Sequence, residues 1–192
     1  MIQRVIRWWP PIAVTAMVLL GFMVGKSSTP IDDWFLQFRG PAQWLLIFSD
    51  APLLAFVMGG TVAVPLSRRR WRLAAVALLS PGIAWVFVQL LKPVFDRHTE
   101  GGVLAYPSGH TTVGFVIWGM FVVVAGATAW SVITAVISSL FALVGVGSTF
   151  HYFTDTIGGA LLGSAIVCVA VLITTPKLTR VNPDAICVTQ DG

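Results

Sequence analysis

The feature that most constrains this chain is a series of apolar runs, each about as long as a helix that crosses a lipid bilayer. The hydrocarbon core is about 30 Å thick and an α-helix rises about 1.5 Å per residue, so a spanning helix needs about 20 apolar residues. Runs of this kind, bounded by charged residues or by Gly and Pro, lie at residues 9–25, 49–67, 72–91, 109–126, 130–150 and 156–175. Because lipid cannot satisfy backbone N–H and C=O groups, the runs predict an all-α integral membrane protein with six transmembrane helices.

The composition agrees with a membrane protein. Of the 192 residues, 56% are hydrophobic and only 10% are charged, whereas about a quarter of the residues in a soluble domain are charged. No long polar stretch separates the runs, so the sequence predicts a single membrane domain over residues 1–192, with residues 176–192 as a cytoplasmic tail. The first run follows Arg4 and Arg7 as a signal peptide would, but no small-x-small cleavage site follows it. We therefore interpret this run as a retained first span.

The chain between the first two runs has a different pattern. Residues 30–46 alternate polar residues with the aromatic residues Trp34, Phe35, Phe38 and Trp44. This pattern indicates either a short amphipathic segment at the membrane interface or a plain loop. Asp32 and Asp33 are expected to be exposed loop charges, and Asp50 to be an interfacial cap where the second span begins.

The basic residues are divided unevenly between the two ends of the predicted spans. Eight fall at one end, namely Arg4, Arg7, Arg68, Arg69, Arg70, Arg72, Lys177 and Arg180, and four at the other, namely Lys26, Arg39, Lys92 and Arg97. The positive-inside rule then places both termini in the cytoplasm of a multi-pass protein of the cell membrane. This topology accounts for the net charge of +4, so we expect no nucleic-acid partner.

The end with fewer cations carries most of the residues that can do chemistry. Residues 92–110 and 150–155 contain all three histidines of the chain, and both stretches are predicted to face away from the cytoplasm. Ionisable residues at the edge of a membrane are costly, so their concentration on one face favours a functional role.

The first of these stretches is suited to binding phosphate. Ser108 and Gly109 lie where the fourth span begins, and a helix N-terminus presents unpaired N–H groups to an anion. The serine hydroxyl adds a hydrogen-bond donor, and glycine lets the backbone approach the anion closely. Lys92 and Arg97 supply the cations that phosphate oxygens require. The sequence therefore predicts a phosphate site formed by these four residues.

The second stretch is suited to nucleophilic catalysis. His151 and Asp155 are four residues apart, so on a helix they would share one face, and the carboxylate would orient the imidazole as a nucleophile. His110 is then the general acid for the leaving group and afterwards the base for water. His98 and Glu100 are expected to be solvated loop residues. No HExxH-type spacing occurs and the nearby cations would repel a metal ion, so no metal or other cofactor is predicted.

These residues, over about positions 30–175, resemble the motifs of the type 2 phosphatidic acid phosphatase family. That family carries a lysine with Arg-Pro seven residues later, then Pro-Ser-Gly-His, then Ser-Arg followed by a histidine and an aspartate. The second motif is complete here at residues 107–110, and His151 with Asp155 match the end of the third. The resemblance implies a helical bundle in which His151 is the nucleophile, Asp155 its orienter and His110 the acid and base. It also implies that Lys92, Ser108 and Gly109 bind phosphate.

The sequence departs from that pattern at two places. The Arg-Pro of the first motif falls on Thr99 and Glu100, although Arg97 stands two residues earlier and is expected to substitute for the missing arginine. The Ser-Arg pair of the third motif falls on Val144 and Gly145, so a cationic phosphate ligand is missing there.

Three functions from different classes remain open at this point. The favoured one is a membrane lipid phosphatase that hydrolyses a phosphomonoester or pyrophosphate of a phospholipid or polyprenyl lipid through a phosphohistidine intermediate. The alternative is a non-catalytic relative that binds lipid phosphate or acts as a scaffold for a partner that builds the cell envelope. The third is a metal-dependent membrane hydrolase built on the histidines. The sequence identifies neither the lipid nor the oligomeric state.

Overall fold

The computed structural model describes residues 2–99 and 101–175, and it is built from helices. The elements are α1 (Ile2–Val24), α2 (Pro30–Leu36), α3 (Arg39–Ala42), the 3-10 helix η1 (Gln43–Phe48), α4 (Ala51–Ser67), α5 (Trp71–Phe95), α6 (Gly109–Ala125), α7 (Ala129–Thr149) and α8 (Phe153–Thr174). The predicted tail at residues 176–192 and Glu100 lie outside the described residues.

The predicted spans correspond closely to helices of the structure. Five helical segments are long and apolar enough to cross a membrane: Gln3–Val24, Arg39–Ser67, Trp71–Phe95, Ala129–Thr149 and Phe153–Thr174. The fourth predicted span is the shorter apolar helix α6, whose 17 residues correspond to about 25 Å. The all-helical, membrane-type fold is thus confirmed.

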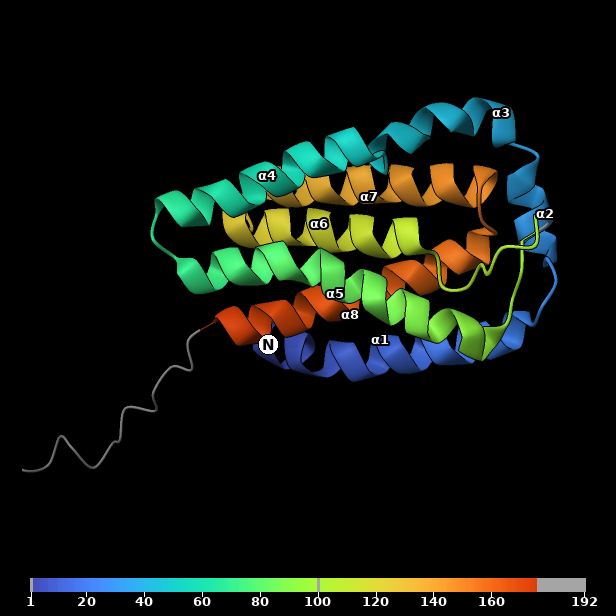
Figure 1. Ribbon diagram of the computed structural model, residues 1–192, viewed down its shortest axis with the longest axis horizontal. Coiled ribbons are helices and arrows are strands. Elements are labelled where there is room, and N and C mark those ends of the chain that lie inside the picture. Colours follow the sequence, from blue (N-terminus) through green and yellow to red (C-terminus); the bar gives the residue numbers. More distant parts are fainter. Residues whose placement is uncertain (1, 100, 176–192) are drawn as a thin grey trace, which may run out of the picture.

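The short helix α6 lies in the middle of the bundle, where it contacts α4, α5, α7 and α8 (Figure 1). Its buried Val116 and Met120 pack with alanines of α5 and α8. Two glycines allow close packing with α8: a Cβ at Gly119 would lie 2.5 Å from Val167, and one at Gly163 would lie 2.9 Å from the Thr112 carbonyl oxygen. Small residues at helix contacts are typical of membrane bundles.

The first helix is an integral part of the bundle. Helix α1 packs along α8, and the Trp9 indole donates a hydrogen bond of 2.9 Å to the Ser164 hydroxyl. The Tyr106 hydroxyl, from the chain between α5 and α6, donates a hydrogen bond to the Met17 carbonyl. Helix α1 is thus attached to α8 and to the chain before α6 by side-chain hydrogen bonds.

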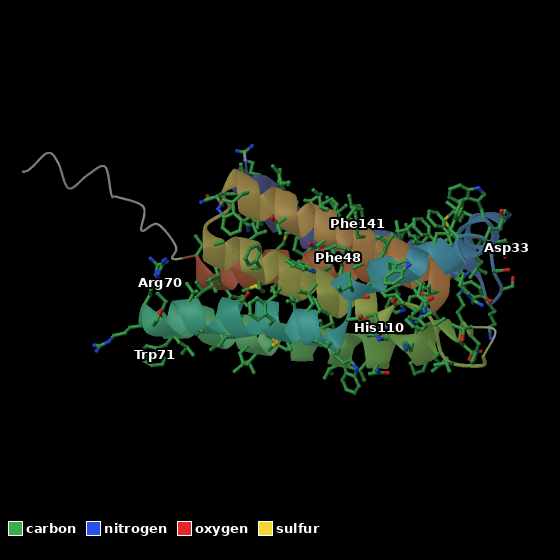
Figure 2. The ribbon with its side chains drawn as sticks, turned by 90° about the horizontal axis from the view of Figure 1, so that it is seen from above. Asp33, Phe48, Arg70, Trp71, His110 and Phe141 are labelled. Carbon is green, nitrogen blue, oxygen red and sulfur yellow. The ribbon has the colours of Figure 1, made fainter. Side chains whose placement is uncertain are left out.

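Aromatic side chains are exposed at both ends of the bundle. Trp8, Trp71 and Trp130 are exposed at the end that carries Arg68–Arg72, and Trp34, Phe38 and Trp44 at the opposite end. Figure 2 shows Arg70 and Trp71 far from Asp33 along the long axis. Between the ends the outer surface is largely apolar. Tryptophan at two levels with an apolar band between them is the pattern of a protein that spans a bilayer.

The amphipathic segment predicted at residues 30–46 is helical in the structure. Helix α2 begins with a capping box, in which Thr29 is the N-cap, Pro30 occupies the first turn and Asp32 bonds back to the Thr29 N–H at 2.9 Å. Asp33 is exposed as expected, but the prediction for Asp32 is wrong, since its side chain is completely buried. The reason is a pairing with a distant arginine, described below.

Candidate active site

A cavity of about 610 Å³ opens between α4, α5 and α6 at the end of the bundle that carries α2. Its polar part is lined by Lys92 from α5, His110 from α6 and His151 from the chain after α7, together with Ser49, Asp50 and Gly109. In Figure 2, His110 lies on the Asp33 side of the molecule. Asp50 occupies the N-cap position of α4, as predicted, but its side chain makes no capping hydrogen bond.

The deeper wall of the cavity is apolar. Three helices contribute just over one turn each: Leu54, Ala55 and Met58 from α4, Trp85 with the polar Gln89 from α5, and Val113 and Ile117 from α6. Four residue steps of an α-helix correspond to a rise of about 6 Å. The cavity therefore has the amphiphilic character of a lipid headgroup with the start of its chain.

His151 does not lie on a helix, which corrects the geometry assumed from the sequence. It stands between α7 and α8, and Tyr152 is the N-cap of α8. Its Nδ1 is nevertheless 3.8 Å from Asp155 Oδ2. This nitrogen is buried and has no hydrogen-bond partner among the described residues. The two residues thus approach because Asp155, in the first turn of α8, lies beside the residue that precedes the N-cap. A decrease of less than about 1 Å in the Nδ1–Oδ2 distance would make the contact a hydrogen bond.

Asp155 is held in place by other donors. Its Oδ1 accepts a hydrogen bond of 2.7 Å from Arg97 Nη1, and its Oδ2 accepts one of 3.2 Å from the Tyr152 N–H. The side chain is completely buried. The carboxylate is therefore fixed with one oxygen directed toward His151.

The second histidine faces the same space. His110 lies in the first turn of α6, and its ring centroid is 6.2 Å from that of His151. The Phe150 ring lies 6.3 Å from His110 and forms part of the same wall. A group held between the two imidazoles can contact both of them.

Ser108 and Gly109 are placed differently from each other. Ser108 is buried as the N-cap of α6, where its hydroxyl oxygen accepts from the Thr111 N–H at 3.5 Å and from the Thr111 hydroxyl at 3.2 Å. Gly109 lines the cavity. Ser108 thus supports the helix N-terminus, whereas Gly109 presents backbone to the cavity.

Arg97 does not line the cavity. Its guanidinium is completely buried, with Nη1 donating to Thr154 Oγ1 and Asp155 Oδ1 at 2.7 Å each. Nη2 donates to Asp32 Oδ2 at 2.8 Å and to the Ser27 carbonyl at 2.9 Å. It also lies 4.6 Å from the centre of the Tyr152 ring. The structure thus brings Lys92, Gly109, His110 and His151 to one cavity and places Arg97 behind His151.

The structure shows what surrounds the two positions at which the sequence departs from the family motifs. A Cβ at Gly145 would lie 2.9 Å from the carbonyl carbon of Leu45, because η1 packs directly against α7 there. Thr99 lines a smaller cavity of about 250 Å³ together with Arg39 and His151. His98, expected to be solvated, is exposed.

Asp32 is the site residue that sequence reasoning missed. Besides Arg97, it accepts from the Thr154 N–H at 2.8 Å and the Thr154 hydroxyl at 3.1 Å, so it caps the start of α8. The sequence Thr29-Pro30-Ile31-Asp32 carries a capping-box signature that could have indicated a helix start. Nothing local indicated the partner 65 residues away.

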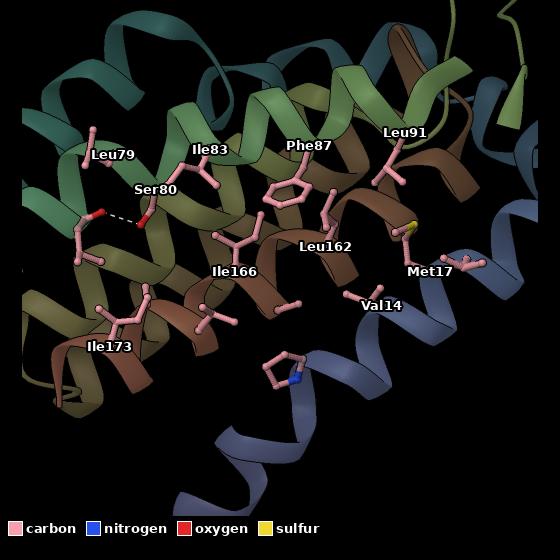
Figure 3. A pocket seen from close by; sticks show the side chains of 16 residues that line it. Val14, Met17, Leu79, Ser80, Ile83, Phe87, Leu91, Leu162, Ile166 and Ile173 are labelled. Carbon is pink, nitrogen blue, oxygen red and sulfur yellow. Dashed lines mark hydrogen bonds between the residues drawn. The ribbon is translucent and has the colours of Figure 1, made fainter. Parts of the chain in front are cut away.

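A second cavity, of about 470 Å³, lies on the opposite face of α5, between α1 and α8 (Figure 3). Leu79, Ile83 and Phe87 line it. The Ser80 hydroxyl there donates a hydrogen bond of 2.6 Å to the Val76 carbonyl within the same helix. This cavity is apolar and contains none of the predicted site residues.

Within residues 2–99 and 101–175, no group of three His, Cys, Asp or Glu side chains is arranged to hold a metal ion. Comparison of the chain with protein-family models, with curated proteins and with solved structures gives no match.

Proposed function

We propose that this protein is a membrane lipid phosphatase of the kind its motifs resemble, with six membrane spans and its site on the extracytoplasmic face. The observation that carries the proposal is the facing pair His110 and His151 in one cavity with Lys92, with Asp155 behind His151. A nucleophile, an orienting carboxylate, an acid and a cation are the groups that phosphoryl transfer through an enzyme intermediate requires.

In the first step, Asp155 accepts the His151 Nδ1 proton in a hydrogen bond, and Nε2 attacks the phosphorus. The P–N bond forms as the P–O bond to the leaving group breaks, and His110 gives its proton to the departing oxygen. In the second step, His110 takes a proton from water, the water oxygen attacks phosphorus and the P–N bond breaks. The products are the dephosphorylated lipid and phosphate, and both histidines regain their starting state.

The shape of the cavity supports a lipid substrate. Phosphate oxygens fit the polar end beside Lys92 and the Gly109 backbone, and an apolar chain fits the deeper wall formed by α4, α5 and α6. A phosphomonoester and a pyrophosphate of a phospholipid or polyprenyl lipid both satisfy this description.

The cations support a second candidate, a protein that binds lipid phosphate without turnover. Among the described residues, Lys92 is the one Lys or Arg side chain that lines the larger cavity, since Arg97 is engaged by two carboxylates and Gly145 has replaced the family arginine. Each charge-assisted hydrogen bond contributes about 1.5–3 kcal/mol, so the lost arginine favours slower chemistry than the family motifs imply.

The proposal is tested by phosphate release from a panel of lipids by the purified chain in detergent. The panel contains phosphatidic acid, phosphatidylglycerol phosphate, polyprenyl phosphate and polyprenyl pyrophosphate. We expect release from at least one lipid, loss of release in His151→Ala, and retention of release in His98→Ala, the matched change at an exposed histidine. Binding of these lipids without hydrolysis, equally tight in His151→Ala, would show that the non-catalytic candidate is correct.

The same assay addresses the third possibility, a metal-dependent hydrolase. The site pairs two histidines with a lysine, a set suited to holding an anion. We expect turnover to continue with EDTA present and to be inhibited by vanadate, which mimics pentacoordinate phosphorus. Loss of activity with EDTA that zinc or magnesium restores would contradict this expectation.

A further inference from the structure

Behind His151 lies a buried cluster of three charged side chains from three distant parts of the chain. Arg97 bridges Asp32 of α2 and Asp155 of α8, with N–O distances of 2.8 and 2.7 Å, and all three side chains are completely buried. Two carboxylates and one guanidinium carry a formal net charge of −1. Charge of this kind is expensive to bury unless a further cation balances it.

The cation that can balance the cluster is His151 itself. Its Nδ1 lies 3.8 Å from Asp155 Oδ2, and it becomes positively charged when Nε2 carries a phosphoryl group. The other charged or titratable groups near His151 face it from the cavities: Lys92 and His110 with Asp50 on one side, and Arg39 on the other. The phosphate of a bound substrate offsets Lys92, so the excess negative charge behind the ring remains available to the imidazolium.

We propose that Asp32 is a positioning residue of the active site: by engaging Nη2 of Arg97 it keeps the guanidinium from binding both oxygens of Asp155, and so leaves Asp155 Oδ2 available to stabilise the charged form of His151. This inference rests on the proposed phosphatase function and adds a residue outside the three motifs.

The geometry gives Asp32 the means to do this. Its Oδ2 accepts a hydrogen bond from Arg97 Nη2, so the guanidinium presents only Nη1 to Asp155. Without that partner, the planar fork of Arg97 can turn to bind both oxygens of Asp155, the arrangement that arginine and carboxylate prefer. Asp155 Oδ2 would then no longer be directed to His151.

Asp32 is itself held rigidly. Its Oδ2 accepts from the Thr29 N–H at 2.9 Å and from the Thr29 hydroxyl at 2.8 Å, while Oδ1 accepts from the Thr154 N–H at 2.8 Å. The Phe35 ring stacks on the Phe153 ring with centroids 3.5 Å apart, which joins α2 to the first turn of α8. The helix that carries Asp32 is therefore docked on the helix that carries Asp155.

The test compares Asp32→Asn with Asp33→Asn in the full-length chain purified in detergent, using the lipid that the wild type hydrolyses. Asn keeps the size of the side chain and an acceptor for Thr154 but removes the charge, and Asp33 is the exposed neighbour on the same helix. We expect Asp32→Asn to lower kcat by about 10- to 100-fold with KM within about twofold, because Asp32 does not touch the substrate. Asp33→Asn should match the wild type.

Two further measurements separate positioning from loss of structure. A lipid phosphonate, which binds but is not hydrolysed, should bind Asp32→Asn and the wild type equally. If Asp32→Asn does not fold, Thr29→Val removes one donor to Asp32 and keeps its charge, and it should lower kcat severalfold at unchanged KM. If the variant that folds, Asp32→Asn or Thr29→Val, has the same kcat as the wild type, the proposed role of Asp32 is wrong. A raised KM at unchanged kcat would overturn it as well. No His151-dependent release from the wild-type chain overturns the phosphatase function and this inference together.

Discussion

At Gly145, close packing excludes the residue that a sequence motif suggests. The family resemblance calls for an arginine there, but a Cβ would already lie 2.9 Å from the carbonyl carbon of Leu45 and 3.0 Å from the backbone nitrogen of Leu46. Backbone atoms of η1 cannot give way as the end of a flexible side chain can. The position is therefore set by close packing between α7 and η1.

We predict that Gly145→Arg destabilises the protein instead of raising its activity. Overpacking of this kind costs about 1–3 kcal/mol, and a buried guanidinium adds to it. Thermal unfolding in detergent, together with phosphate release, measures the effect. Gly114→Ala is the control, since Gly114 is buried in α6 but has nothing within 4 Å of its Cβ position. Normal stability with increased turnover in Gly145→Arg would show that η1 can move away.

Arg97 gives a second prediction at the scale of the residue. Arg97→Gln leaves Asp32 and Asp155 buried without their cation, which we expect to cost about 3–5 kcal/mol of unfolding free energy. Arg68→Gln changes an exposed arginine at the other end of the bundle and should cost little. Thermal unfolding of both variants in the same detergent tests this. Equal unfolding temperatures would mean that the buried cluster contributes no net stability.

Among the elements, α2 joins the exposed end of the bundle to the candidate site. Its Trp34 is exposed, while Asp32 and Phe35 attach it to α8. Burial alone would raise the pKa of Asp32, but hydrogen bonds from the Thr154 N–H and from the side chain and backbone of Thr29 outweigh it and lower that pKa. The attachment of α2 is therefore strongest when Asp32 is ionised.

This direction predicts how stability depends on pH. A carboxyl whose pKa is lower in the folded than in the unfolded state stabilises the fold above its unfolded value of about 3.9, and that contribution is lost as pH falls through the folded pKa. We expect the unfolding temperature of the wild type to fall more steeply than that of Asp32→Asn below about pH 4. Asp33→Asn should keep the wild-type steepness. Identical curves for wild type and Asp32→Asn would contradict the prediction.

The elements also show what the sequence can and cannot predict. Apolar runs predicted most of the spanning helices to within a few residues. Helix α1 begins at Ile2 and not near residue 9, because its first turns carry arginine and tryptophan, and the second apolar helical segment begins at Arg39 and not at residue 49. Clustering of His110, His151 and Lys92 at one end followed from the order of the spans. The burial of Asp32 and Arg97 did not, because each depends on a partner more than 50 residues away.

For the whole molecule, the arrangement of charge and tryptophan defines two ends. The described arginines at the first end are exposed, whereas at the site end Arg97 is buried and paired and Lys92 lies in the cavity. This leaves two exposed cations at the site end, Lys26 and Arg39, against six among the described residues at the other end, which strengthens the charge asymmetry behind the proposed orientation.

We therefore predict that a cysteine placed at Gly101 reacts with a membrane-impermeant maleimide added to intact cells, while one at Ser67 reacts only after permeabilisation. Both positions are exposed and lie at opposite ends of the bundle. The background for this experiment has Cys168 and Cys187 replaced by alanine. The reverse labelling pattern would place the site in the cytoplasm.

The packing of α1 on α8 has a consequence for how the chain is made. These are the first and last helices in the described chain, yet they are extensively in contact (Figure 1). During synthesis α1 is made long before its partner exists, so the contact between α1 and α8 cannot form until the ribosome has produced Phe153–Thr174. The same last segment brings Asp155 to Arg97. A premature stop that removes α8 thus deprives the chain of its contact with α1 and of the carboxylate proposed to orient His151 in a single event.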